Sequence, residues 1–259
     1  MTSTNLINYN PINLHSNLAL IIQNLNTFVL DQPILHDLNL EFQKSQIIFV
    51  LGKNGSGKSS LAQAIMGNPD YVCEGRVMYK NQNLLELSVD QRSQLGVFVS
   101  SQSPIEIAGV NLANYLKLIV NYNRQARNLS KLPTPDLLVQ IKSFMKKLNW
   151  DEKFLKRGLN EGMSGGERKK CEILQMLLLD SDLVILDEID SGLDIDAVEV
   201  ICRVVRDFLN PNKTLIIISH SPKILEFFEP NQVVILKNGF VERVGGRSVA
   251  TSVFAKGFE

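Results

Sequence analysis

Cysteine is scarce in this sequence, and no stretch is apolar enough to cross a membrane. The three cysteines, Cys73, Cys171 and Cys202, lie far apart and form no CxxC pair. This spacing argues against a disulfide framework or a metal centre held by the chain alone, and it fits a reducing compartment. No run of about 18 apolar residues occurs, so the sequence predicts no membrane-spanning helix.

An excess of charge of either sign is also missing, because Lys plus Arg and Asp plus Glu each total 27. This balance does not support a general nucleic-acid binder or a polybasic membrane surface. No Lys or Arg precedes Lys44, which argues against a signal peptide or an Arg-rich transit peptide. Residues 1–17 are rich in Asn, Ser and Thr and contain no apolar core, so we expect a flexible N-terminal tail.

The sequence does contain short apolar strands interrupted by a helical region. Its 259 residues suit one large α/β domain, which we expect over 18–259. The region over about 103–181 contains many helical windows and no strong strand, and Pro133 and Pro135 divide it in two. We therefore expect a helical subdomain over about 103–181. Asn238-Gly239 predicts a hairpin turn. Strands are expected at 18–24, 35–42, 47–51, 76–79, 96–100, 183–186, 214–219, 232–236 and 240–244.

A glycine-rich run, Gly-Lys-Asn-Gly-Ser-Gly-Lys-Ser, lies between an apolar strand and a helix start. A phosphate-binding loop requires this context. The glycines let successive backbone N–H groups point at a triphosphate, and the positive end of the helix dipole adds to the site. Lys58 would contribute a charge for the β- and γ-phosphates, and Ser59 a hydroxyl for Mg²⁺. The predicted nucleotide-binding residues are Gly52, Lys53, Asn54, Gly55, Ser56, Gly57, Lys58, Ser59 and Ser60.

Two carboxylates, Asp187 and Glu188, end the apolar run over 183–186. A carboxylate at the end of such a strand can hold Mg²⁺ through its water shell, opposite Ser59. Glu188, one residue further on, can polarise an attacking water. Acidic residues also follow strands simply as helix caps. Beside a phosphate loop, however, we expect this pair to take part in the chemistry.

A second helix start carries two adjacent glycines. Ser164 and Glu167 form an S-x-x-E capping box, which explains the Ser and the Glu but not Gly165 and Gly166 between them. Glycines at a helix start let a phosphate approach the exposed N–H groups. A chain with one phosphate loop and a second, remote anion-binding helix start is expected to sandwich nucleotide between two subunits.

These motifs, in this order, resemble those of an ABC-type ATPase over about residues 19–245. The run from Asp190 to Asp194 resembles the D-loop of that family. His220 follows an apolar strand and resembles the switch histidine, which contacts the γ-phosphate in the family. Gln102 resembles the Q-loop glutamine, a Mg²⁺ ligand and sensor of the γ-phosphate.

The resemblance implies a P-loop, RecA-like α/β core with a mixed sheet, an antiparallel β subdomain and a helical subdomain. It also implies an Mg²⁺-dependent ATPase with Glu188 and His220 as catalytic residues. Nucleotide contacts beyond the phosphate loop would come from Gln102, Ser164, Gly165, Gly166, Glu167 and Asp194. The metal ligands would be Ser59, Gln102 and Asp187.

More narrowly, four stretches resemble SufC, the ATPase of the Suf iron–sulfur cluster assembly system. They cover residues 67–71, 103–110, 164–176 and 190–197. The stretch over 103–110 follows the Q-loop, where ABC ATPases meet their partner subunits. The resemblance implies SufB-like and SufD-like scaffold partners and a transient, ATP-dependent homodimer. It also implies a plastid stroma, with the gene in the plastid genome, or a bacterial cytosol.

The chain departs from the SufC pattern at two positions. Ser103 follows Gln102 where SufC proteins usually have Tyr, and Ser221 follows His220 where Tyr is also usual. Phe28 lies near the position that stacks on adenine in many ABC ATPases, but it could face the core instead.

Two other functions compete with cluster assembly. The chain could be the nucleotide-binding subunit of a membrane transporter, whose coupling surface also lies next to the Q-loop. It could instead act on ribosomes or DNA, although such ABC ATPases usually carry two cassettes or a long coiled-coil insertion, and this chain has neither.

Overall fold

The computed structural model describes residues 17–100 and 104–258. Its strands are β1 (Leu18–Val29), β2 (Gln32–Gln43), β3 (Ile47–Leu51), β4 (Val72–Tyr79), β5 (Gln82–Asn83), β6 (Val97–Ser100), β7 (Ile107–Asn111), β8 (Gly158–Leu159), β9 (Leu183–Asp187), β10 (Thr214–Ile218), β11 (Gln232–Lys237) and β12 (Phe240–Gly245). Its α-helices are α1 (Lys58–Met66), α2 (Val89–Gln94), α3 (Leu112–Ala126), α4 (Thr134–Lys147), α5 (Gly165–Leu179), α6 (Ile195–Phe208), α7 (Ile224–Phe227) and α8 (Arg247–Lys256). Two 3₁₀ turns, η1 (Leu84–Glu86) and η2 (Glu152–Lys156), lie between them.

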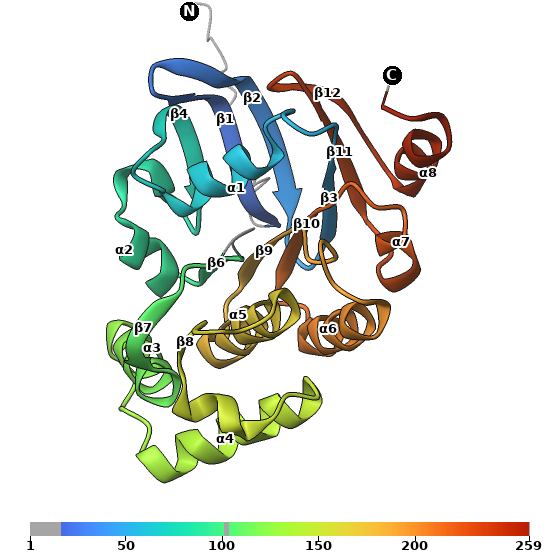
Figure 1. Ribbon diagram of the computed structural model, residues 1–259. Helices are drawn as coiled ribbons and strands as arrows, with labels where there is room; N and C mark the ends of the chain where they lie inside the picture. The colour runs from blue at the N-terminus through green and yellow to red at the C-terminus, as the bar shows by residue number, and fades with distance from the viewer. Residues whose placement is uncertain (1–16, 101–103, 259) are drawn as a thin grey trace, which may run out of the picture.

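A six-stranded sheet in the order β12-β11-β3-β10-β9-β6 forms the centre of the molecule (Figure 1). Its strands pair in parallel except for β12, which is antiparallel to β11. The central strands are almost continuously apolar because helices or a second sheet cover both faces. Asn238 and Gly239 both have positive φ between β11 and β12, which confirms the expected Asn-Gly hairpin.

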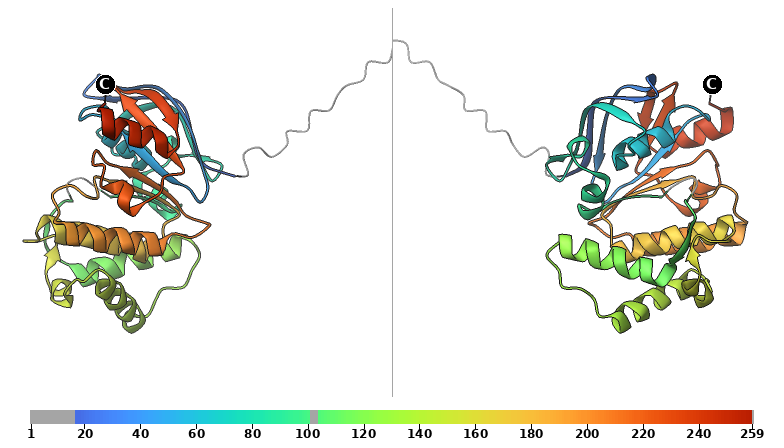
Figure 2. Two further views of the ribbon diagram at one scale, coloured as in Figure 1. Left: turned by 90° about the vertical axis from the view of Figure 1, so that its right-hand side faces the viewer. Right: turned by 60° about the vertical axis from the view of Figure 1, so that its left-hand side comes forward.

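Alternate residues of the central strands face two separate cores. Ile48 and Val50 of β3 point into the core shared with α1, β1 and β2. Phe49 and Leu51 point into the core shared with α3, α5 and α6. Figures 1 and 2 show the antiparallel strands and α1 on one side of the sheet and α5 and α6 on the other. Between these layers, the carboxyl ends of β3, β10 and β9 share one edge, where α/β sheets bind ligands.

A second sheet, in the order β2-β1-β4-β5, is antiparallel throughout and packs over the α1 core. The expected combination of a parallel-rich core with an antiparallel β part is therefore confirmed. The pattern of buried residues along β2 switches phase near Asp37, a residue with positive φ. Such a bulge shifts which side chains face the core.

Helices α3 and α4 lie at the end of the molecule opposite β12 and α8 (Figure 2). Pro133 is the N-cap residue of α4 and Pro135 lies in the first turn of that helix, so the expected break between two helices is confirmed at Pro133. The sequence predicted no strong strand in this region, and the structure adds two short strands, β7 and β8, which form a small antiparallel sheet. Two residues in β8 are too few to show a period of two, and β7 is mostly exposed and contains a glycine. Among the described residues, no helix is both long and apolar enough to cross a bilayer.

Candidate functional site

The phosphate loop lies between β3 and α1, at the edge where the parallel strands end. Gly57, which precedes α1, has a φ of 99°, and a Cβ there would lie 2.5 Å from Leu35 Cδ2. Glycine suits both this left-handed backbone and this close approach. From outside, Gly239 N donates a hydrogen bond to Ser56 O at 3.1 Å. The loop is therefore held in shape by its neighbours, while its tip, residues 53–55, is exposed.

Lys58 is a buried cation whose donors point back into the loop. Its Nζ donates to Gly52 O at 2.8 Å and to Lys53 O at 2.9 Å, and the residue is 5% exposed. Burial lowers the pKa of Lys58, while the charges of Glu188 and Asp187 act in the opposite direction. The ammonium and both predicted carboxylates thus share one site, as the sequence predicts for a phosphate-binding lysine.

Lys58→Ala is expected to weaken ATP binding by about ten- to a hundred-fold, because charge-assisted hydrogen bonds to phosphate are lost. Titration with a fluorescent ATP analogue measures the change in affinity. The exposed Lys131→Ala is the control and should bind as the wild type does. An unaltered dissociation constant for Lys58→Ala would contradict the phosphate-loop interpretation.

Asp187, the last residue of β9, is fully buried. Within the described part of the chain, neither of its carboxylate oxygens accepts a hydrogen bond. Burial raises the pKa of Asp187, and the negative charge of Glu188 raises this pKa further. The nearby Ser59 hydroxyl lowers the pKa, although it does not form a hydrogen bond of full geometry with the carboxylate. Mg²⁺ prefers carboxylate, hydroxyl and phosphate oxygens. Asp187 and Ser59 therefore fit a magnesium site, where the ion would neutralise phosphate charge.

Glu188 begins the loop after β9 and has a φ of 49°, an uncommon backbone for a residue other than glycine. Its N–H donates to Ile218 O at 2.9 Å, which ties the loop to the end of β10. Glu188 Oε1 lies 3.5 Å from His220 Nδ1, so the two predicted catalytic residues are brought together. Ser219, the residue directly before His220, is held by Asp190, because its hydroxyl contacts both Asp190 carboxylate oxygens at 3.1 Å.

Two polar groups near Asp187 were not predicted from the sequence. Asp187 N donates to Ser100 Oγ at 3.1 Å, from the end of the neighbouring strand β6. Lys169, a buried residue of α5, donates to Asp187 O at 3.4 Å and pairs with Glu172 at 3.1 Å. The only sequence signals were a serine ending an apolar strand and a Lys–Glu pair spaced to lie on one helix face.

The two other glycine-containing motifs both begin helices. Ser164 N-caps α5, and its backbone N–H donates to Glu167 Oε2 at 2.7 Å, which confirms the capping box. Asp194 N-caps α6, where Ala197 N donates to Asp194 Oδ1 at 2.7 Å. The nucleotide contacts expected of Ser164, Glu167 and Asp194 stay predictions.

The start of α5 has free space around its glycines. Among the described residues, a Cβ at Gly165 would meet only Gly192 O, at 3.8 Å. A Cβ at Gly166 would meet only Leu193 Cδ2, at 3.7 Å. Packing against the described residues therefore does not require glycine at either position. The neighbouring atoms belong to the D-loop region and not to the phosphate loop of the same chain.

Some expectations concern residues outside the described ranges or stay open. Gln102 lies outside the described residues, as do residues 1–16 of the expected tail. Phe28 is half-buried in β1, where it pairs with Pro33 and Val72. Its expected contact with adenine stays a prediction.

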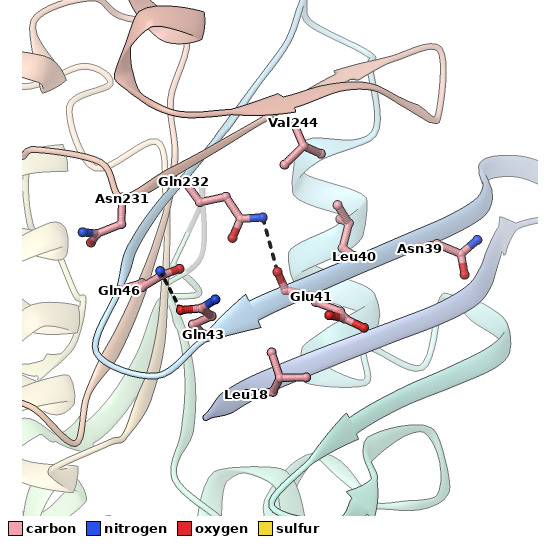
Figure 3. Close-up of a pocket in the computed structure, with 9 residues that line it drawn as sticks. All are labelled: Leu18, Asn39, Leu40, Glu41, Gln43, Gln46, Asn231, Gln232 and Val244. Carbon is pink, nitrogen blue, oxygen red and sulfur yellow. Dashed lines mark hydrogen bonds between the residues drawn. The ribbon is translucent and has the colours of Figure 1, made fainter. Parts of the chain in front are cut away.

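A polar groove of about 380 Å³ lies away from this site (Figure 3). Gln46 and Asn231 precede β3 and β11, so the groove adjoins the amino ends of the parallel strands. Across it, Gln232 Nε2 donates to Glu41 O at 3.3 Å. None of the predicted site residues lines this groove.

Comparison with known proteins identifies the family. The family model described as "ABC transporter" matches residues 35–191. The "Probable ATP-dependent transporter ycf16" of Trieres chinensis is 39% identical over 92% of this chain and 95% of the relative. The "ABC transporter I family member 6, chloroplastic" of Arabidopsis thaliana is 38% identical over 88% of this chain and 68% of the relative.

A solved structure shares the fold at lower sequence identity. It is a dimeric ATP-binding cassette in a post-hydrolysis state with ADP and phosphate bound. The TM-score is 0.75 at 19% identity, over 88% of this chain and 98% of that one. The family match, the phosphate loop, the buried Asp187 and the paired Glu188 and His220 agree with one another. The chain therefore belongs to the ABC transporter family and is an ATPase that binds ATP with Mg²⁺.

Proposed function

We propose that this ATPase drives conformational change in an iron–sulfur cluster scaffold built with SufB-like and SufD-like subunits. Two copies would close on ATP, and hydrolysis at Glu188 and His220 would let them open and reshape the scaffold. We place the protein in a plastid stroma or a bacterial cytosol. The SufC-like stretches support this proposal, and the name of the chloroplastic Arabidopsis relative supports the location.

The proposed dimer would join the phosphate loop of one copy to Ser164, Gly165 and Gly166 of the other. The open space at both glycines supports this arrangement, because it leaves the N–H groups at the start of α5 accessible to a phosphate from outside. A groove of about 290 Å³ between the D-loop and His220 would face the same interface. The dimeric solved cassette is consistent with the proposal.

An apolar groove supports the proposed binding of a partner subunit. This groove, which we call the α3 groove, has a volume of about 400 Å³ and lies between α2, β6, α3 and α5. Leu118 and Tyr122 are 68% and 54% exposed there. An exposed apolar surface of this kind is typical of an interaction site. Its main apolar residues are Phe98, Tyr115, Leu118, Ile119, Tyr122 and Leu179.

The described part of the SufC-like stretch, residues 104–110, leads into α3 and is connected to α5 through Glu106. Ile105 is 77% exposed, and its carbonyl accepts a hydrogen bond from Asn160 Nδ2 at 2.7 Å. Glu106 forms an ion pair with Arg168 at 3.0 Å. Arg168 directly follows Glu167, the last residue of the α5 capping box. Movement of a partner docked on this stretch would therefore reach Ser164 and its two glycines, as ATP-dependent scaffold remodelling requires.

Reconstitution with SufB-like and SufD-like subunits tests the proposal. We expect the three proteins to form a complex, and cluster assembly on the scaffold to need ATP and a hydrolysis-competent Glu188. Cluster assembly that proceeds equally without ATP would overturn the proposal. The readout is the ultraviolet–visible absorbance of the cluster, followed with ATP, without it, and with the Glu188→Gln variant.

The second candidate is the nucleotide-binding subunit of a membrane transporter. The names of the relatives favour it, since those from Trieres chinensis and Arabidopsis are both described as transporters. Fractionation of cells containing a tagged chain separates the two functions. Recovery with a membrane-spanning partner supports transport, whereas recovery with scaffold subunits in the membrane-free fraction supports cluster assembly.

Leu118→Asp is expected to weaken partner binding by about ten-fold or more, because a charge would have to be buried in the apolar α3 groove. ATP hydrolysis by the isolated chain should change little, since Leu118 is exposed and lies outside the nucleotide site. Val139→Asp is the matched control, because Val139 is also an exposed apolar helix residue, 71% exposed, but on α4. The affinity is measured as binding of each variant to surface-immobilised partner. Equal affinity for Leu118→Asp and Val139→Asp would show that the groove is not the docking site.

A further inference from the structure

Arg92 is a buried charged residue that none of the sequence motifs includes. It belongs to α2, is 5% exposed, and its Nη1 donates to Ala64 O at 2.8 Å and Ile65 O at 3.0 Å. Its Nε donates to Leu87 O at 3.0 Å. The guanidinium therefore closes the last turn of α1, the helix that begins with the phosphate-binding Lys58.

The end of α1 depends on this contact. The helix has no basic residue in its own last turn, so a cation that interacts favourably with its terminal carbonyls must come from elsewhere. Gly67, the C-cap residue, has a φ of 83°. A Cβ at Gly67 would lie 2.5 Å from Arg92 Cζ, so glycine leaves room for the guanidinium. The planar guanidinium of arginine presents its donors from separate nitrogens in a fixed geometry, whereas lysine presents all of its donors from one nitrogen on a flexible chain.

We propose that Arg92 is a positioning residue for ATP binding: it fixes the far end of α1 and thereby the phosphate-binding groups at its start. Because α1 is one continuous helix of nine residues, a shift at Met66 is expected to displace Lys58 and Ser59 as well. Small displacements of such groups strongly affect reactions that depend on orientation. This inference concerns the ATPase itself and does not depend on the scaffold proposal.

The position of Arg92 also connects α1 to the α3 groove. Asp90, Ser93 and Gln94 of the same short helix line that groove, as does Met66 at the end of α1. A group bound in the groove would press on α2, and the Arg92 hydrogen bonds would carry this movement to α1. Arg92 thus lies between the α3 groove and α1, the helix that begins at the phosphate loop.

The test compares Arg92→Met and Arg92→Lys with the wild type in steady-state ATP hydrolysis. We expect the KM for ATP to rise about ten-fold in Arg92→Met and about three-fold in Arg92→Lys, with kcat within about two-fold of the wild type. Saturating ATP would restore the position of α1. We therefore expect KM to change much more than kcat. Direct nucleotide titration should show the same order of affinities.

Arg92→Met also leaves two buried carbonyl groups and one half-buried carbonyl group without the Arg92 donors, so it is expected to lower thermal stability. Lys213→Met controls for this loss. Lys213 is equally 5% exposed, and its Nζ donates to Ser181 O at 3.0 Å beyond the end of α5. The control should unfold at a lower temperature yet keep the wild-type KM. If Arg92→Met kept the wild-type KM, or if Lys213→Met raised the KM equally, Arg92 would have only a structural role and the inference would be wrong.

Discussion

Glu188→Gln is expected to lower the rate of ATP hydrolysis about a hundred- to ten-thousand-fold, the usual contribution of a general base. Glutamine keeps the size and hydrogen-bonding shape of the side chain but cannot take a proton from water. The hydrogen bond from Glu188 N to Ile218 O fixes the backbone independently of the side chain, so the variant should fold normally. ATP binding should change little, because the phosphate loop is intact.

The rate of ATP hydrolysis is measured from phosphate release. The lifetime of the dimer is followed by light scattering in the presence of ATP. If two copies close on ATP as proposed, Glu188→Gln should remain dimeric with ATP for longer than the wild type, since the nucleotide that would hold them together persists. Glu199→Gln is the control, because Glu199 is exposed on α6 and should hydrolyse ATP at the wild-type rate. Normal turnover by Glu188→Gln would remove Glu188 from the catalytic role.

Asp187→Asn is expected to abolish most Mg²⁺-dependent hydrolysis and, at neutral pH, to raise the melting temperature of the nucleotide-free protein. A buried carboxylate without hydrogen-bond partners among the described residues destabilises the fold when it is charged. Burial raises the pKa of Asp187 for the same reason. A neutral amide removes this charge, and each kcal/mol so gained would raise Tm by about 2–4 °C.

Thermal unfolding with and without MgATP separates the two effects of Asp187→Asn. The wild type should be stabilised strongly by MgATP, because ligand that binds only the folded state shifts the unfolding equilibrium. The variant should start from a higher Tm and gain less. Ser181→Ala tests whether any buried polar group near β9 behaves similarly, since Ser181 is 1% exposed but distant from the carboxyl end of the strand. A lower Tm for Asp187→Asn than for the wild type would contradict this account.

The sequence predicted most of the sheet and the main groups of the site. Continuous apolar runs identified β3, β9 and β10 because a parallel sheet buries both faces. The phosphate loop was identified from its glycine-rich run between a strand and a helix, and Asp187 and Glu188 from their place at the end of an apolar run. His220 was identified from its resemblance to the switch histidine of the family, and the roles of these residues stay predictions. Local capping chemistry correctly predicted the start of α5 from Ser164 and Glu167 alone.

The parts that were missed depend on contacts between distant segments. Ser100 and Asp187 are 87 residues apart in sequence, and Arg92 and Ala64 are 28 apart. No local pattern encodes such pairs, because a buried Ser or Arg in a single sequence resembles an exposed one. The β7–β8 pair was missed for a related reason, since β8 is defined only by its partner strand.

The hydrogen bonds of the Lys58 ammonium to Gly52 O and Lys53 O have a consequence for nucleotide exchange. They close the loop on itself, so its curvature does not depend on an anion. The entropy of ordering this segment is lost when the chain folds, not when ATP arrives, and a preorganised receptor binds more tightly for the same contacts. Departure of ADP should therefore leave behind a receptor ready for the next ATP, with no refolding step between turnovers.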